Sequence, residues 1–275
     1  PIKGVSCDTR VLNKGDLFIA INGVRFNGLD FLKEANALGA SAILVEDYPS
    51  TKLQDEISIP LIKVKSTVRA FGELAKFHKK RFNIPVVAVT GSNGKTTTKE
   101  AISSVLNVKY KLIKNSGTEN NHIGVPKTLF RLSNIHQLAV LEMGMNHLGE
   151  IDYLGGICEP AVGVLTNIAP AHLEYLENIE NILKAKSELL KHLKKDSVLI
   201  LNSDDTKLRG LMKKSPCKVI TFGIRRPSQI RASRISNKNN SLEFKVGKTN
   251  FSVGILGRHN IYNMLAAVAV GEVFG

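Results

Sequence analysis

The strongest constraint on the fold of this 275-residue chain is a glycine-bounded loop that follows a short apolar run. Residues 86–89 read Val-Val-Ala-Val, and residues 90–96 continue Thr-Gly-Ser-Asn-Gly-Lys-Thr. A buried strand, a glycine turn and a Lys-Thr pair opening a helix are typical of a phosphate-binding loop. Gly91 and Gly94 let backbone N–H groups turn toward phosphate oxygens, and the positive end of the following helix adds to that field. The pattern predicts a nucleotide site; an ordinary glycine-containing turn is the alternative.

The loop has the shorter of two possible forms. The common form carries a glycine five positions before Gly94, where this chain has Val89. Lys95 is expected to reach the β- and γ-phosphates, and the Thr96 hydroxyl to lie on Mg²⁺. The residues expected to contact the nucleotide here are Gly91, Ser92, Asn93, Gly94, Lys95, Thr96 and Thr97.

The rest of the chain alternates strand-like and helix-like segments. At this length two domains with proper cores are possible, and we expect a small N-terminal α/β domain over residues 1–84. The pattern breaks at Asn83-Ile84-Pro85, after which residues 85–275 predict a central doubly wound α/β domain with a mainly parallel sheet. Short antiparallel strands are expected within residues 228–256.

The expected elements follow hydrophobic periodicity. Strands are predicted at residues 16–21, 42–45, 61–64, 86–89, 138–142, 162–167, 198–202 and 218–222. Helices are predicted at residues 31–38, 67–81, 98–106, 126–132, 179–193 and 260–274.

Composition limits the class of protein. The net charge of +14 suggests polyanionic ligands, but aromatic residues are only 6% and tryptophan is absent, so base-stacking platforms and nucleic-acid binding are not expected. No apolar run approaches the ~20 residues that span a bilayer, which argues against membrane insertion. Cys7, Cys158 and Cys217 are far apart in the sequence and are expected to be reduced. A cytoplasmic protein is predicted.

Two residues at or just past the ends of predicted strands are candidates for metal binding. Glu142 closes the apolar run 138–141, where a buried carboxylate is costly unless a cation such as Mg²⁺ meets it. A structural glutamate with satisfied hydrogen bonds is the alternative. His172 follows the next predicted strand in the same way and can ligate a metal through a neutral nitrogen, although lone histidines are more often structural.

Lys186 lies on the apolar stripe of a predicted helix. It shares a face with Leu183 and Leu190. A lysine in such a position is either a surface residue with a buried stem or a group that is paired or modified. The residues alone leave both open.

Several segments, in the same order, make the chain similar to the Mur ligase family. Residues 90–100 resemble that family's ATP loop, and residues 142–150, Glu-Met-Gly-Met-Asn-His-Leu-Gly-Glu, resemble its second segment. The further matching segments are residues 5–10, 14–18, 120–126, 167–174, 185–186 and 257–263. The resemblance runs from about residue 4 to residue 275.

The resemblance implies a role for each matched position. Lys95, His172 and Lys186 are the implied catalytic residues. The implied metal sites are one Mg²⁺ between Thr96 and Glu142, and a second between His172 and a carbamylated Lys186. Asn260 and Asn263 are expected to read adenine. The implied substrate-binding residues are Asp8, Thr9, Arg10, Arg25, Asn27, Thr118, Asn120, Asn121 and Asn146.

The activity that follows from the resemblance is ATP-dependent amide ligation in peptidoglycan precursor synthesis. A terminal carboxylate of UDP-N-acetylmuramoyl-tripeptide would be activated as an acyl phosphate and attacked by the amine of D-alanyl-D-alanine, with ATP and Mg²⁺ as cofactors. A monomer is expected. The family also has a third, C-terminal domain, which we expect to be missing from this chain. The alternatives are a Mur-type ligase for another amino acid or a polyglutamate-type substrate, and a nucleotide-dependent nucleic-acid-binding module.

Overall fold

The computed structural model describes residues 1–275 except Val24, Arg25, Thr118, His172 and Asn239. The chain divides into two compact units. Unit 1 comprises residues 1–81 and 129–131, and unit 2 comprises residues 82–128 and 132–275.

Unit 1 is a small α/β unit built on a parallel sheet. Within its described residues the sheet has the order β1-β2-β3-β4. Its strands are β1 (Val5–Ser6), β2 (Leu17–Ile19), β3 (Ala42–Val45) and β4 (Leu61–Lys63). Its α-helices are α1 (Leu32–Ala37), α2 (Thr51–Asp55) and α3 (Thr67–Lys80). Ser66 caps α3 by accepting the N–H of Arg69 (3.3 Å), and Phe71 and Ala75 form its buried face.

Unit 2 is organised around a second, larger sheet. In the part of the chain that the structure describes, its strands have the order β13-β12-β11-β10-β9-β8-β5-β7-β6. The strands are β5 (Val86–Thr90), β6 (Leu112–Lys114), β7 (Leu138–Glu142), β8 (Val162–Leu165), β9 (Val198–Asn202), β10 (Lys218–Gly223), β11 (Ile230–Lys238), β12 (Ser241–Val246) and β13 (Thr249–Val253). Pairing is parallel from β6 to β11 and antiparallel from β11 to β13. The prediction of a mainly parallel α/β fold is confirmed.

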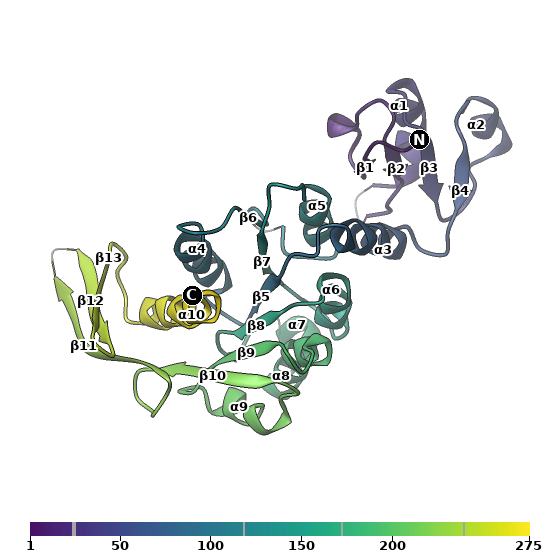
Figure 1. The fold of residues 1–275 in the computed structure, drawn as a ribbon. Helices are drawn as coiled ribbons and strands as arrows, with labels where there is room; N and C mark the ends of the chain where they lie inside the picture. The colour runs from purple at the N-terminus through teal and green to yellow at the C-terminus, as the bar shows by residue number, and fades with distance from the viewer. Residues whose placement is uncertain (24–25, 118, 172, 239) are drawn as a thin grey trace. The chain divides into compact units, whose positions relative to one another are not determined.

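Helices cover both faces of this sheet. Figure 1 shows α4 (Lys95–Leu106) and α10 (His259–Phe274) side by side on one face, with α6 (Glu150–Cys158) and α8 (Ile179–Ser187) on the other. The remaining helical segments are α5 (Gly124–Phe130), α7 (Leu173–Leu176), α9 (Thr206–Arg209) and the 3₁₀ turns η3 (Glu188–His192) and η4 (Met212–Lys214). Residues from α4, α10 and β5 share one apolar core, which fastens the helix after the glycine loop to the sheet.

Some segments differ from the expectation. β1, β6 and α6 were not predicted, since β1 and β6 are short and α6 follows a loop with no strong cap signal. The predicted helix 179–193 is α8 followed by the 3₁₀ turn η3. In η3 the Glu188 carboxylate accepts the N–H groups of Gly149 (2.8 Å) and Asp152 (3.1 Å), so it caps the N-terminus of α6.

Among the helices of the described residues, none is both long enough and apolar enough to span a bilayer.

Candidate active site

The glycine loop lies at the switch point of the large sheet. After β5 the chain builds β6 and β7 on one side of β5 and then β8 on the other. Ligands of open α/β sheets bind outside the carboxyl ends of the strands at such a point. The loop after β5 is therefore where the fold itself places a binding site.

Both loop glycines are required by the geometry. Gly91 has φ +151°, and a Cβ there would lie 1.9 Å from Oγ1 of Thr166. Gly94 has φ +76° and is the N-cap of α4; a Cβ there would lie 2.4 Å from Oδ1 of Asn263. Neither site accepts a larger residue without strain, as close approach of backbone to a ligand demands.

The loop is joined to the segment after β8. The Ser92 N–H donates to the Asn167 carbonyl (2.9 Å), and its hydroxyl donates to the Ala169 carbonyl (2.8 Å). The Asn93 N–H donates to Oδ1 of Asn167 (2.9 Å), while the Thr166 hydroxyl donates to the Asn93 carbonyl (2.7 Å). The loop, part of the matched segment 90–100, is thus joined to residues 166–169, where the matched segment 167–174 begins.

Lys95 lies across this loop. Its Nζ donates to the carbonyls of Gly91 and Ser92, each at 3.0 Å. Burial lowers the pKa of Lys95, and the Glu142 carboxylate opposes that shift. A partly desolvated ammonium group held above a glycine loop is suited to neutralising phosphate charge.

Glu142 is the carboxylate of the site. It ends β7, is 2% exposed, and receives the Thr96 hydroxyl on Oε2 (2.8 Å) and the Asn120 amide on Oε1 (2.8 Å). Hydroxyl and carboxylate oxygens next to a phosphate loop are ligands that Mg²⁺ prefers. The residues present fit one Mg²⁺ between Thr96 and Glu142.

Lys186 is the buried amine of α8. Lys186 is 1% exposed, and its pKa is lowered to about 7. Burial is the larger cause of this shift, and the positive charge of Lys95 is the smaller one. It is therefore not a surface residue with a buried stem. An unmodified amine is a poor Mg²⁺ ligand, whereas the carbamate would supply oxygens. His172 lies outside the described residues, so the second predicted metal pair stays a prediction.

The low pKa of Lys186 predicts a pH-dependent stability. Between pH 7 and 10.5 the unfolded chain binds more protons at this lysine than the folded chain, so stability rises with pH there. We expect Lys186→Met to raise the free energy of unfolding at pH 7, with the difference from wild type shrinking toward pH 10. Urea denaturation of both proteins between pH 7 and pH 10, in CO₂-free buffer, measures this difference in the free energy of unfolding. Lys184→Met, exposed on the same helix, is the control, and a pH-independent difference would contradict the shift.

The predicted adenine residues are engaged within the protein. Asn260 donates from Nδ2 to the Leu256 carbonyl (2.7 Å) and accepts on Oδ1 from Asn263 (2.9 Å). Asn263 accepts the Thr98 hydroxyl on Oδ1 (3.1 Å). Both side chains are buried, and Asn263 connects α10 to the first turn of α4. A role in reading adenine stays a prediction.

The predicted substrate residues belong to both units. In unit 1, Asp8 caps a 3₁₀ turn (η1, Thr9–Val11) and pairs with Arg10 (2.7 Å), while Thr9 donates to Glu34 (3.0 Å). Asn27 caps the 3₁₀ turn η2 (Gly28–Phe31) by accepting the Leu29 N–H. Arg25 and Thr118 lie outside the described residues.

In unit 2, the Asn120 amide donates to the Glu142 carboxylate. Asn121 accepts the N–H groups of Ile123 (3.1 Å) and Gly124 (2.9 Å) at the start of α5. Asn146 is exposed on the loop before α6, and its N–H donates to Glu150 (2.6 Å). Thr97 is half-buried on α4. The substrate roles of these residues stay predictions.

Sequence reasoning missed two polar residues beside Glu142. Asn115, directly after β6, bonds to the backbone of Glu142, and Lys99 on α4 bonds to Asn115. A signal for Lys99 was present: it has helical spacing with the apolar Ile102 and Leu106, so it falls on the buried face. The position of Asn115 could be predicted only by recognising β6, the three-residue strand before it.

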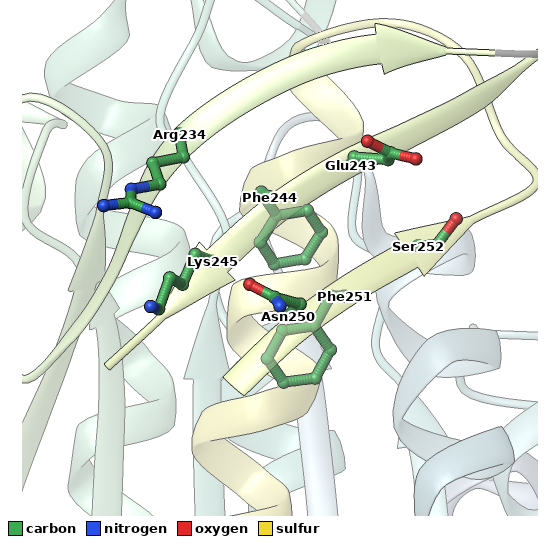
Figure 2. A pocket seen from close by; sticks show the side chains of 7 residues that line it. All are labelled: Arg234, Glu243, Phe244, Lys245, Asn250, Phe251 and Ser252. Atoms are coloured by element: carbon green, nitrogen blue, oxygen red, sulfur yellow. The ribbon is translucent and has the colours of Figure 1, made fainter. Parts of the chain in front are cut away.

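A cavity of about 390 Å³ lies elsewhere in unit 2, on the antiparallel extension of the sheet (Figure 2). Figure 2 shows polar side chains from all three strands around it, and none is a predicted site residue. Its lining residues are Arg234, Glu243, Phe244, Lys245, Asn250, Phe251 and Ser252.

A glycine loop at the switch point of a parallel sheet, with a lysine and a carboxylate facing it, defines a P-loop nucleotide-binding protein of the α/β class. Its family follows from comparison with known proteins. The Mur ligase middle domain matches residues 89–271, and the catalytic domain of the Mur ligase family matches residues 1–79. The chain belongs to the Mur ligase family.

Particular relatives are similar along the whole chain. The UDP-N-acetylmuramoyl-tripeptide–D-alanyl-D-alanine ligases of Bacillus subtilis and Escherichia coli are each 37% identical in sequence to this chain. Both matches cover 100% of this chain; they cover 59% of the Bacillus subtilis enzyme and 61% of the Escherichia coli enzyme. A crystal structure of MurF from Acinetobacter baumannii matches with a TM-score of 0.91 at 32% identity, covering 100% of this chain and 60% of that one. The crystal structure of MurF ligase from Thermotoga maritima in complex with ADP matches with a TM-score of 0.90 at 29% sequence identity. The match covers 99% of this chain and 63% of that one. The chain spans about three fifths of the length of these relatives.

Proposed function

We propose that this chain is the nucleotide- and acceptor-binding part of an ATP-dependent ligase that joins D-alanyl-D-alanine to UDP-N-acetylmuramoyl-tripeptide. The observation that carries the proposal is the pairing of the Thr96 hydroxyl with the Glu142 carboxylate beside Lys95, at the carboxyl ends of β5 and β7. It is supported by relatives with that name at 37% identity and by a structural relative solved with ADP.

The chemistry assigns distinct tasks to these side chains. The tripeptide carboxylate attacks the γ-phosphorus of ATP, and the bond from that phosphorus to the β,γ-bridging oxygen breaks. ADP leaves, and the tripeptide carries an acyl phosphate. Lys95 and the loop N–H groups balance charge on the phosphate oxygens during this step. Mg²⁺, when held by Thr96 and Glu142, would supply further charge neutralisation. The dipeptide amine then attacks the acyl carbon, loses a proton, and phosphate leaves.

The roles of individual site residues are part of the proposal. The adenine contacts of Asn260 and Asn263 belong to it, as does the second metal site at His172 and a carbamylated Lys186. So do the substrate contacts in residues 1–84, proposed as the UDP-substrate domain beside a central ATP-binding domain at 85–275. Cytoplasmic location and a monomeric state also stay predictions.

The test is ADP formation by the intact protein with MgATP and UDP-N-acetylmuramoyl-tripeptide, with and without D-alanyl-D-alanine. We expect turnover only when tripeptide and dipeptide are both present, since the acyl phosphate needs an amine to release phosphate. Matched reactions replace the dipeptide by D-alanine, by L-alanyl-L-alanine or by glutamate. Turnover that is indifferent to the dipeptide, or faster with glutamate, would contradict the proposal and favour another ligase of the family.

A further inference from the structure

Helix α4 carries a lysine that nucleotide binding leaves unexplained. Lys99 has a side chain that is 0% exposed, and it lies one helical turn after Thr96. Its Nζ donates to the backbone carbonyl of Asn115 (2.8 Å) and pairs with the Glu100 carboxylate (3.2 Å). Removing an ammonium group from water is costly unless it is paired and hydrogen-bonded, so these contacts indicate what the lysine holds.

The group that Lys99 contacts is itself buried and fully engaged. Asn115 is 0% exposed and lies directly after β6. Its side-chain amide donates to the Glu142 carbonyl (3.0 Å) and to the Glu119 carbonyl (2.8 Å), while its Oδ1 accepts the Glu142 N–H (2.9 Å). The Asn115 side chain therefore bonds to both backbone groups of Glu142, as a neighbouring strand would.

Helix α4 consequently holds Glu142 at two points. Thr96 contacts the carboxylate directly at 2.8 Å. Lys99 acts on the backbone of the same residue through Asn115. Residues three apart on a helix lie on one face, so both contacts come from the same side of α4. Asn120, in the loop that follows Asn115, completes the arrangement by donating to the other carboxylate oxygen.

We propose that Lys99 is a positioning residue for Glu142, acting through Asn115 to set where the carboxylate meets Thr96 and the metal ion of the nucleotide. An apolar residue at this position would leave the buried Asn115 carbonyl without this donor, which favours displacement of Asn115. The inference rests on the proposed function only in requiring that Glu142 bind the nucleotide's metal.

The test separates metal-dependent from metal-independent nucleotide binding in the intact protein. Lys99→Met keeps an unbranched side chain and removes the donor. We expect the dissociation constant of Mn²⁺ in the presence of ADP, measured from the EPR signal of free Mn²⁺, to rise about tenfold or more, as for other residues that orient metal ligands. ADP binding in EDTA, measured by calorimetry, is expected to change less than about twofold, because the glycine loop is untouched.

Two variants complete the design. Lys114→Met removes the other lysine that pairs with Glu100 but lies on the surface, and is expected to leave both constants unchanged. If Lys99→Met does not fold, Asn115→Ser, which is too short to reach both Glu142 groups, is measured in its place with the same expectation. Lys99→Met or Asn115→Ser folding with wild-type Mn²⁺ affinity would overturn the proposal, and so would failure of both to fold, which assigns Lys99 and Asn115 to stability. Absence of metal-dependent ADP binding in wild type would instead count against the proposed function.

Discussion

Replacing Lys95 by methionine is expected to lower the rate of ADP formation by about 1,000-fold. The ammonium group is partly buried above the loop carbonyls of Gly91 and Ser92, where its charge is weakly screened. Charge that builds on the transferring phosphoryl oxygens would lose its nearest cation, and removing a single such group typically costs factors of this size. Methionine keeps the apolar stem, so the loop is expected to stay folded.

The measurement is kcat with saturating substrates, accompanied by thermal unfolding to confirm the fold. Lys213→Met, on an exposed turn, removes one positive charge elsewhere and is expected to keep wild-type activity. A Lys95→Met protein that retains more than roughly a tenth of wild-type kcat would exclude a role for this lysine in phosphoryl transfer, because loss of a transition-state cation is not compatible with so small an effect.

Gly91→Ala is expected to weaken nucleotide binding by roughly 100-fold, since backbone strain of up to about 3 kcal/mol corresponds to that factor. Two independent features cause the strain. The φ of +151° disfavours a residue with a Cβ, and that Cβ would overlap the Thr166 hydroxyl at 1.9 Å. Moving Thr166 would also release its hydrogen bond to Asn93, and with it the shape of the loop.

Calorimetric titration with ADP measures the effect, and two further variants locate its cause. Gly247→Ala, at φ +55° with open space around the site, is expected to bind ADP normally. The double variant Gly91→Ala, Thr166→Ala removes the hydroxyl that the new Cβ meets, so its effect is expected to be less than the sum of the single changes. Wild-type affinity in Gly91→Ala would show that the loop does not approach the phosphates closely.

The residues of the phosphate loop were predictable because they are contiguous. Apolar residues, two glycines and a Lys-Thr pair determine a strand, a turn and a helix start from local geometry alone. Glu142 was predictable for a related reason, since it ends an apolar run that had to be a buried strand. The alternation of strands and helices likewise predicted the parallel sheet, which places both groups at one edge.

Contacts between distant segments were not predictable in this way. Asn115 and Glu142 are 27 residues apart, and they meet because β6 pairs with β7. The chain reads Leu-Ile-Lys at β6, too short a pattern to predict a strand. The contact of Asn263 with Thr98 is of the same kind: the two residues are 165 apart in the sequence, and they meet because α10 packs against α4.

Local patterns were enough to predict an α/β protein with a phosphate loop, because strand, turn and helix propensities act over a few neighbouring residues. The burial of Lys186, with its pKa of about 7, and the contact of Lys99 with Asn115 follow instead from how distant segments pack together. A lysine on an apolar stripe is compatible with exposure or with burial, and the choice depends on what packs against the helix. Which segments pack against that helix is set by strand order and helix packing, which bring together residues far apart in the chain.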